Sequence, residues 1–185
     1  MRGQQLSNIQ CSQMQALKIV LMCMAGAVLY GIIHDQFTAR ICVEYFSVFH
    51  PPVFSTQSPT LLALGWGVTA TWWVGTFLGV TLACAARLGS RRKMEAAELK
   101  LPLAKVLLGM GAMAIACGTA GYVLTIHSVI SPPAWVSSIL PAEKHAAFMT
   151  DWWAHNASYL SGFVGGLSLC VVTFRKRRSA EGLSG

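Results

Sequence analysis

Four long runs of apolar residues dominate the sequence and leave few folds open to it. They extend over residues 16–33, 60–86, 101–126 and 152–174. A helix that crosses a bilayer needs about 20 mostly apolar residues, and the last three runs meet that length. The first run is shorter, and we expect its helix to continue through His34 and Asp35. The pattern therefore predicts four transmembrane helices.

The composition supports an integral membrane protein. The chain is 54% hydrophobic and only 11% charged, whereas soluble domains carry about 25% charged residues. We predict an all-α fold, a polytopic four-transmembrane-helix bundle in one membrane domain over residues 1–185, with spans near 16–36, 60–86, 101–127 and 152–174. Ala25-Gly26-Ala27 is similar to a signal-peptide cleavage site, but the apolar run continues to Ile33, so we expect this segment to be retained.

The basic residues indicate how the helices are oriented. Only Arg40 and Lys144 lie in the segments after the first and third runs, out of 14 basic residues. The other twelve lie near the chain ends or between the second and third runs: Arg2, Lys18, Arg87, Arg91, Arg92, Lys93, Lys100, Lys105, Arg175, Lys176, Arg177 and Arg178. Under the positive-inside rule both termini are cytoplasmic. We expect the membrane to be a bacterial inner membrane. The net charge of +7 could suggest a nucleic-acid partner. The basic residues cluster at the ends of apolar runs, however, and this distribution is typical of topology signals.

Small residues recur every four positions in three of the runs. The ridge in the second run consists of Ala63, Gly67, Thr71, Gly75, Gly79 and Ala83. The fourth run carries Ala154, Ser158, Gly162 and Gly166, and the third carries Ala112, Ala116 and Ala120. Such ridges let helices approach closely in lipid. They predict packing faces within the bundle, or an interface with a second copy or with another membrane subunit.

The two outward connections show signs of short helices at the membrane surface. Apolar residues at helical spacing over 41–49 predict a helix in the interface plane, and His50-Pro51-Pro52 ends it. In the second connection, Pro141 precedes another candidate helix. The six cysteines form no CxxC pair, so the sequence indicates neither a disulfide framework nor a thiolate metal site.

All five histidines lie on the predicted outer side, although that side holds only two of the 14 basic residues. At a rise of 1.5 Å per residue, His34 lies about 24 Å from Lys18 along the helix, His127 about 33 Å from Lys105, and His155 about 30 Å from Arg175. The hydrocarbon core is about 30 Å thick. Three helices therefore bring a histidine to nearly the same depth.

Carboxylates accompany these histidines. Asp35 follows His34 directly, and Asp151 shares a helix face with His155 at i and i+4. Helix bundles build metal sites from such inward-facing residues, and this donor set suits Zn, Fe, Mn or Cu. We predict His34, His127, Asp151 and His155 as metal ligands, with Asp35 or Glu44 as a general base. Glu44 could instead pair with Arg40 and be structural.

The segment HDQFTARICVEYFSVFHPP (34–52) and the segment GWGVTATWWVG (65–75) resemble patterns in uncharacterised bacterial four-span membrane proteins. The resemblance covers the first two spans. It implies the four-span fold and carries no activity.

Three functions remain open from the sequence. The first is a metal-dependent enzyme at the outer face, acting on a lipid-like substrate that reaches the site through the bilayer. The second is a haem- or metal-binding subunit for electron transfer, with His34 and His127 or His155 as axial ligands. The third is a non-catalytic subunit or scaffold, in which the small-residue ridges bind partner helices.

Overall fold

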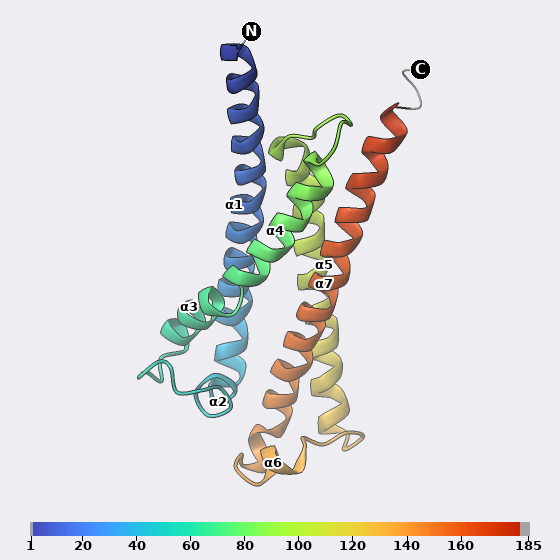
Figure 1. Cartoon of the computed structure of the whole chain (residues 1–185). Helices are drawn as coiled ribbons and strands as arrows, with labels where there is room; N and C mark the ends of the chain where they lie inside the picture. Colours follow the sequence, from blue (N-terminus) through green and yellow to red (C-terminus); the bar gives the residue numbers. More distant parts are fainter. Residues whose placement is uncertain (1, 182–185) are drawn as a thin grey trace. The chain divides into compact units, whose positions relative to one another are not determined.

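A computed structural model describes the backbone of residues 2–181 and the side chains of residues 10–179. This part of the chain is helical, and its elements appear in Figure 1. They are α1 (Arg2–Ile41), α2 (Val43–Ser47), α3 (Pro59–Thr69), α4 (Trp72–Arg87), α5 (Ala96–Ile126), α6 (Ala134–Ser137), the 3-10 helix η1 (Ala142–Lys144) and α7 (His145–Glu181).

Four stretches of this part of the chain are long and apolar enough to cross a membrane, so the predicted four-helix membrane fold is confirmed. They are Gln10–Ile41, Pro59–Arg87, Ala96–Ile126 and Ala142–Ser179. The predicted short helices of the two connections also form, as α2 in the first and as η1 after Pro141 in the second. The second connection contains a further short helix, α6, before Pro141. The helix α2 ends before His50-Pro51-Pro52, and η1 begins directly after Pro141.

The described chain forms two compact units, each built from three separate segments. We call residues 2–28, 71–107 and 163–181 the basic unit, because twelve of the 14 basic residues fall in these segments. We call residues 29–70 and 108–162 the histidine unit, because all five histidines fall in them.

The second span is not one continuous helix. The helix α3 ends at Thr69 and α4 begins at Trp72, so Ala70 and Thr71 interrupt it. No proline lies at this point, and the interruption coincides with the boundary between the two units.

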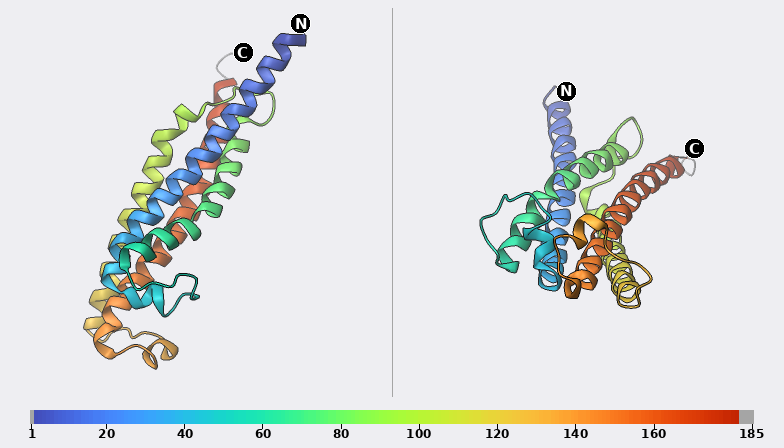
Figure 2. Two further views of the ribbon diagram at one scale, coloured as in Figure 1. Left: turned by 90° about the vertical axis from the view of Figure 1, so that its left-hand side faces the viewer. Right: turned by 90° about the horizontal axis from the view of Figure 1, so that it is seen from below.

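In the basic unit, the small-residue ridge of α4 packs against α1, and Figure 2 shows the two helices side by side. A Cβ on Gly75 would lie 2.7 Å from the Ala27 Cβ and 2.8 Å from the Met24 Cα. A Cβ on Gly79 would lie 2.9 Å from the Val20 Cα. Glycine is therefore needed for two backbones to approach this closely. The ridge serves packing within the chain here.

A buried arginine also holds the basic unit together. Arg177 of α7 is only 2% exposed. Its guanidinium donates to the carbonyl oxygens of Arg92 at 2.7 Å, Ala85 at 2.7 Å and Leu88 at 2.8 Å, with a longer contact to Arg91 at 3.4 Å. These carbonyls lie at the C-terminal end of α4 and in the loop after it, where helical carbonyls lack partners and a positive charge is favourable.

In the histidine unit, glycines again mark the close contacts. A Cβ on Gly67 of α3 would lie 2.6 Å from the backbone nitrogen of Ile32 in α1. A Cβ on Gly121 of α5 would lie 2.7 Å from the carbonyl oxygen of Met149 in α7. In the third span, Ala112 and Ala116 are exposed, so this ridge does not pack within the described chain, and its alternative as an interface with a second copy or partner stays a prediction. A different face of α5 is packed. A repeat of four residues predicts that small residues share one face of a helix, but it does not predict whether that face points toward the other helices.

Candidate metal centre

Three ionisable side chains of the histidine unit meet in one place. His34 and Asp35 come from α1, and His155 comes from α7. One possible ligand atom from each residue lies within 4.8 Å of the other two. Asp35 and His155 are only 6% and 4% exposed, and His34 is partly buried. The rings of His34 and His155 contact edge to face, with centroids 4.5 Å apart. Two neighbouring residues of one helix thus meet a third from another.

The hydrogen bonds of His155 fix its tautomer. Its Nδ1 lies 2.8 Å from the carbonyl oxygen of Asp151, one helical turn earlier. A carbonyl only accepts hydrogen bonds, so Nδ1 carries the proton. In the neutral ring, Nε2 then has a free lone pair, and this atom lies 3.3 Å from the Asp35 Oδ1. Two electron-rich atoms face each other, so a proton or a metal ion must lie between them.

Further polar atoms in this region have no hydrogen-bonding partner. Among the described side chains, His34 Nε2 and both carboxylate oxygens of Asp151 are buried and unpartnered. Asp151 is 0% exposed. The backbone amide of Cys42 lies beside this carboxylate but donates to the Thr38 oxygen at 3.0 Å. Buried polar groups without partners cost free energy, so these atoms also indicate a missing cation or donor.

Aromatic rings surround the cluster. Tyr45 and Phe46 of α2 approach the His155 ring with centroids 4.6 Å and 5.5 Å away. Tyr30 stacks on His34 with centroids 5.7 Å apart, and its hydroxyl lies 2.7 Å from the Ser158 Oγ. These rings exclude water, and a low dielectric strengthens the electrostatic interactions inside.

The structure does not bring His127 into this cluster. Its side chain is exposed, directly after the last residue of α5. The depth estimate placed it at the level of the other two histidines, but depth along a helix does not fix the direction around its axis. Asp35, predicted as a base, lies among the candidate ligands instead.

Glu44 also lies outside the group of three. Its Oε1 is 3.3 Å from the Lys144 Nζ, on the partly exposed surface. The predicted alternative partner, Arg40, donates instead to Gln36 and to the Thr60 hydroxyl. Glu44 thus forms an ion pair, as the structural alternative predicted, but its partner is Lys144 and not Arg40.

Two further groups near the cluster lie outside the membrane spans. Burial lowers the pKa of His50 below its ordinary value, and its Nδ1 lies 2.6 Å from the Tyr45 carbonyl oxygen. Burial raises the pKa of the Cys42 thiol to about 12. A thiol with a raised pKa is a poor nucleophile at neutral pH, because the thiolate is the reactive form.

Sequence reasoning missed the part that α2 plays in this site. The stretch around Tyr45 and Phe46 predicted a helix in the membrane interface, but Phe46 is 2% exposed and both rings contact His155. An apolar face alone does not tell lipid from protein.

Two imidazoles and one carboxylate form a donor set typical of metal sites with open coordination positions. The hydrogen bond from His155 Nδ1 to a backbone carbonyl is the kind that orients metal-ligating histidines. Asp151 would then lie outside the ligand set as a second negative charge. Comparisons of the chain with protein-family models, with curated proteins and with solved structures found no match.

Proposed function

We propose that this protein is an integral membrane metalloprotein that binds one transition-metal ion through His34, Asp35 and His155. Asp151 supplies a second negative charge beside the site. The metals that suit this donor set are Zn, Fe, Mn and Cu. The proposal places the histidine unit at the periplasmic face of a bacterial inner membrane, with both termini in the cytoplasm, on the strength of the charge distribution.

One observation carries this proposal. The lone pair of His155 Nε2 faces an Asp35 oxygen at 3.3 Å, while the other ring nitrogen donates to a backbone carbonyl. A proton between them, on the carboxyl or on the ring, would satisfy these two atoms alone. A divalent ion would also use His34 Nε2, which has no partner among the described residues. It would offset the charges of Asp35 and Asp151 together. The ion therefore accounts for more of the unpartnered atoms than the proton does.

The haem alternative is less well supported. A haem requires its two axial histidines on opposite faces of the porphyrin plane. The rings of His34 and His155 are instead in edge-to-face contact, with centroids 4.5 Å apart. His127, the other candidate axial ligand, is exposed. This packing favours a single ion.

A cavity of about 310 Å³ in the histidine unit favours an enzyme over a purely structural metal site. Among its lining side chains are Ser47, Ser55, Thr56 and Gln57, which can hydrogen-bond to a ligand. Phe46 lines this cavity and also contacts His155. The proposed enzyme admits its substrate here, with the apolar part of a lipid-like substrate remaining in the bilayer.

Elemental analysis of the purified full-length protein tests the proposal. We expect about one transition-metal ion per chain, and less than a tenth of that in His155→Ala and His34→Ala. His127→Ala is the matched control, because this histidine is exposed and lies outside the cluster. Its metal content should equal that of the wild type.

Cobalt provides a second measurement that does not depend on the metal acquired during expression. Titration of metal-free protein with Co²⁺ should give absorption bands in the visible range that saturate at one equivalent. His155→Gln should abolish the bands while its circular dichroism remains helical. A metal-free wild type that gives no such bands, or an equal loss in His127→Ala, contradicts the proposal.

A further inference from the structure

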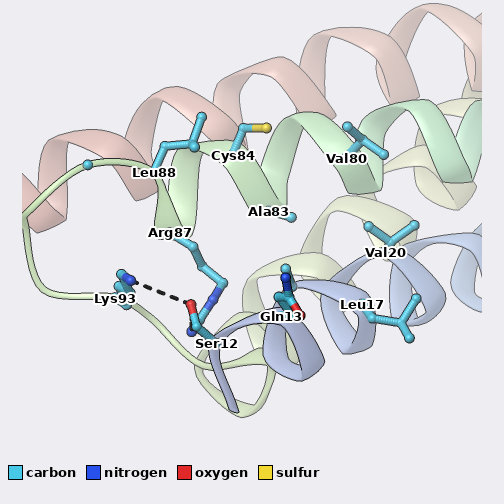
Figure 3. Close-up of a pocket in the computed structure, with 12 residues that line it drawn as sticks. Ser12, Gln13, Leu17, Val20, Val80, Ala83, Cys84, Arg87, Leu88 and Lys93 are labelled. Carbon is cyan, nitrogen blue, oxygen red and sulfur yellow. Dashed lines mark hydrogen bonds between the residues drawn. The ribbon is translucent and has the colours of Figure 1, made fainter. Parts of the chain in front are cut away.

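A second cavity, of about 490 Å³, lies in the basic unit between the first part of α1 and the end of α4 (Figure 3). It is separate from the residues of the metal centre. Its lining consists of Ser12, Gln13, Ala16, Leu17, Val20, Val80, Ala83, Cys84, Arg87, Leu88, Gly89 and Lys93. Arg87, Lys93 and Ser12 lie at one end of this set, and Leu17, Val20 and Val80 lie at the other, as Figure 3 shows.

The polar end carries two positive charges. The Arg87 guanidinium donates to the Met94 carbonyl oxygen at 2.6 Å and to the Ser12 Oγ at 3.2 Å. Its Nε is buried and has no hydrogen-bonding partner among the described residues. Lys93 Nζ lies 3.5 Å from the same Ser12 oxygen. None of the twelve lining residues is acidic. The positive charge at this end is thus available to an anion.

The apolar end opens to the surroundings of the helices. Leu17 is 57% exposed and Val80 is 48% exposed, although both lie within candidate membrane spans. Arg87 is the last residue of its span, and Lys93 lies in the loop beyond it. In a bilayer, acyl chains would therefore contact Leu17 and Val80, while the two basic residues lie at headgroup level.

We propose that this cavity binds one anionic phospholipid. The phosphate lies at the Arg87 guanidinium and the Lys93 ammonium, and an acyl chain lies along Leu17, Val20 and Val80. Two basic residues at the end of membrane helices attract anionic headgroups, and the apolar wall distinguishes a lipid from a free phosphate. This site is independent of the metal centre, so either proposal stands without the other.

Native mass spectrometry of the delipidated full-length protein tests this site, with phosphatidylglycerol and phosphatidylcholine of identical acyl chains added in turn. We expect one phosphatidylglycerol to be retained at concentrations where phosphatidylcholine is not. Lys93→Gln should weaken its binding roughly fivefold, as loss of one basic residue near a headgroup does. Lys93 is exposed, so this variant should fold normally.

Lys100→Gln is the matched control, because Lys100 is exposed and lies outside the cavity. It should bind phosphatidylglycerol as the wild type does. An equal loss in Lys100→Gln, or equal retention of the two lipids, overturns the proposal. Inorganic phosphate serves as a third ligand in a thermal unfolding assay. If it stabilises the protein as much as the lipid does, the site binds a free anion and the lipid proposal is wrong.

Discussion

In the basic unit, the buried Arg177 donates to four backbone carbonyls, whereas in the histidine unit the buried Asp151 accepts no hydrogen bond of good geometry from a described residue. Both are ionisable side chains on the same helix, and both are withdrawn from solvent. A buried charge whose bonds are complete fixes the fold. A buried ionisable group without partners costs free energy, so it marks a place where the packing alone does not explain the residue.

The largest effect in this comparison should come from Arg177→Ala. It removes a charge and leaves the carbonyls at the end of α4 buried without donors, at a cost on the order of 3–5 kcal/mol in the free energy of unfolding. Thermal unfolding in detergent measures this. Arg175→Ala, an exposed neighbour, is the control and should unfold near the wild-type temperature. Equal unfolding temperatures for the two variants would show that Arg177 does not hold the basic unit.

Gly75→Leu should have the next largest effect, because its side chain would meet the backbone of α1, which cannot move aside as a flexible side chain can. Overpacking of this kind costs about 1–3 kcal/mol. A Cβ on Gly109 meets nothing within 4 Å, so Gly109→Leu is the matched control and should leave the unfolding temperature unchanged. A stable Gly75→Leu variant would show that α1 and α4 do not pack closely in the bilayer.

Asp151→Asn tests the histidine unit directly. Asp151 is buried and both of its carboxylate oxygens lack a partner among the described residues, so the neutral amide should stabilise the metal-free protein by about 1–2 kcal/mol. With Zn²⁺ added, the wild type should gain about 2.7 kcal/mol at 100 times the dissociation constant, and the variant should gain less. Unfolding temperatures with chelator and with Zn²⁺ measure both. A metal-free variant that is less stable than the wild type would show that Asp151 has a structural partner.

The smallest effect should come from the ion pair of Glu44 and Lys144. Burial raises the pKa of the Glu44 carboxyl, but hydrogen bonds from its own backbone amide and from Lys144 outweigh this and lower it. Because the folded pKa lies below the unfolded one, the pair stabilises the protein above the unfolded pKa, and this is lost as the pH falls through the folded pKa. The pair is partly exposed, so it contributes under about 1 kcal/mol. Unfolding temperatures of Glu44→Gln from pH 3 to 7 should approach those of the wild type at the acid end.

The number of membrane-spanning helices could be predicted from the sequence, because the bilayer thickness sets the length of an apolar run. The shared depth of His34 and His155 could also be predicted, because the helical rise per residue is constant. The direction of a side chain around its helix could not. His127 and the ridge at Ala112 and Ala116 were at plausible positions along their helices, yet both are exposed. That direction depends on contacts between residues far apart in the sequence.

The role of Arg177 could not be predicted either. In the sequence it is one of four consecutive basic residues after an apolar run. The positive-inside rule treats all four alike, as signals of membrane orientation. Only the packing of α7 beside the end of α4 distinguishes it from its neighbours, which are exposed. Conversely, the pairing of Asp151 with His155 on one helix face was visible from their spacing, because it depends on local geometry alone.

The position of Arg177 near the end of the chain has a consequence for biosynthesis. It lies 85 residues after Arg92, whose carbonyl it binds. At 5–20 residues per second, the ribosome therefore makes this partner roughly 4–17 s after the loop is complete. Until then, the end of α4 lacks the donor that satisfies its carbonyls, and quality-control proteases can act on it. Nascent chains that stop before Arg177 should be degraded faster in a pulse-chase experiment than chains that stop just after it.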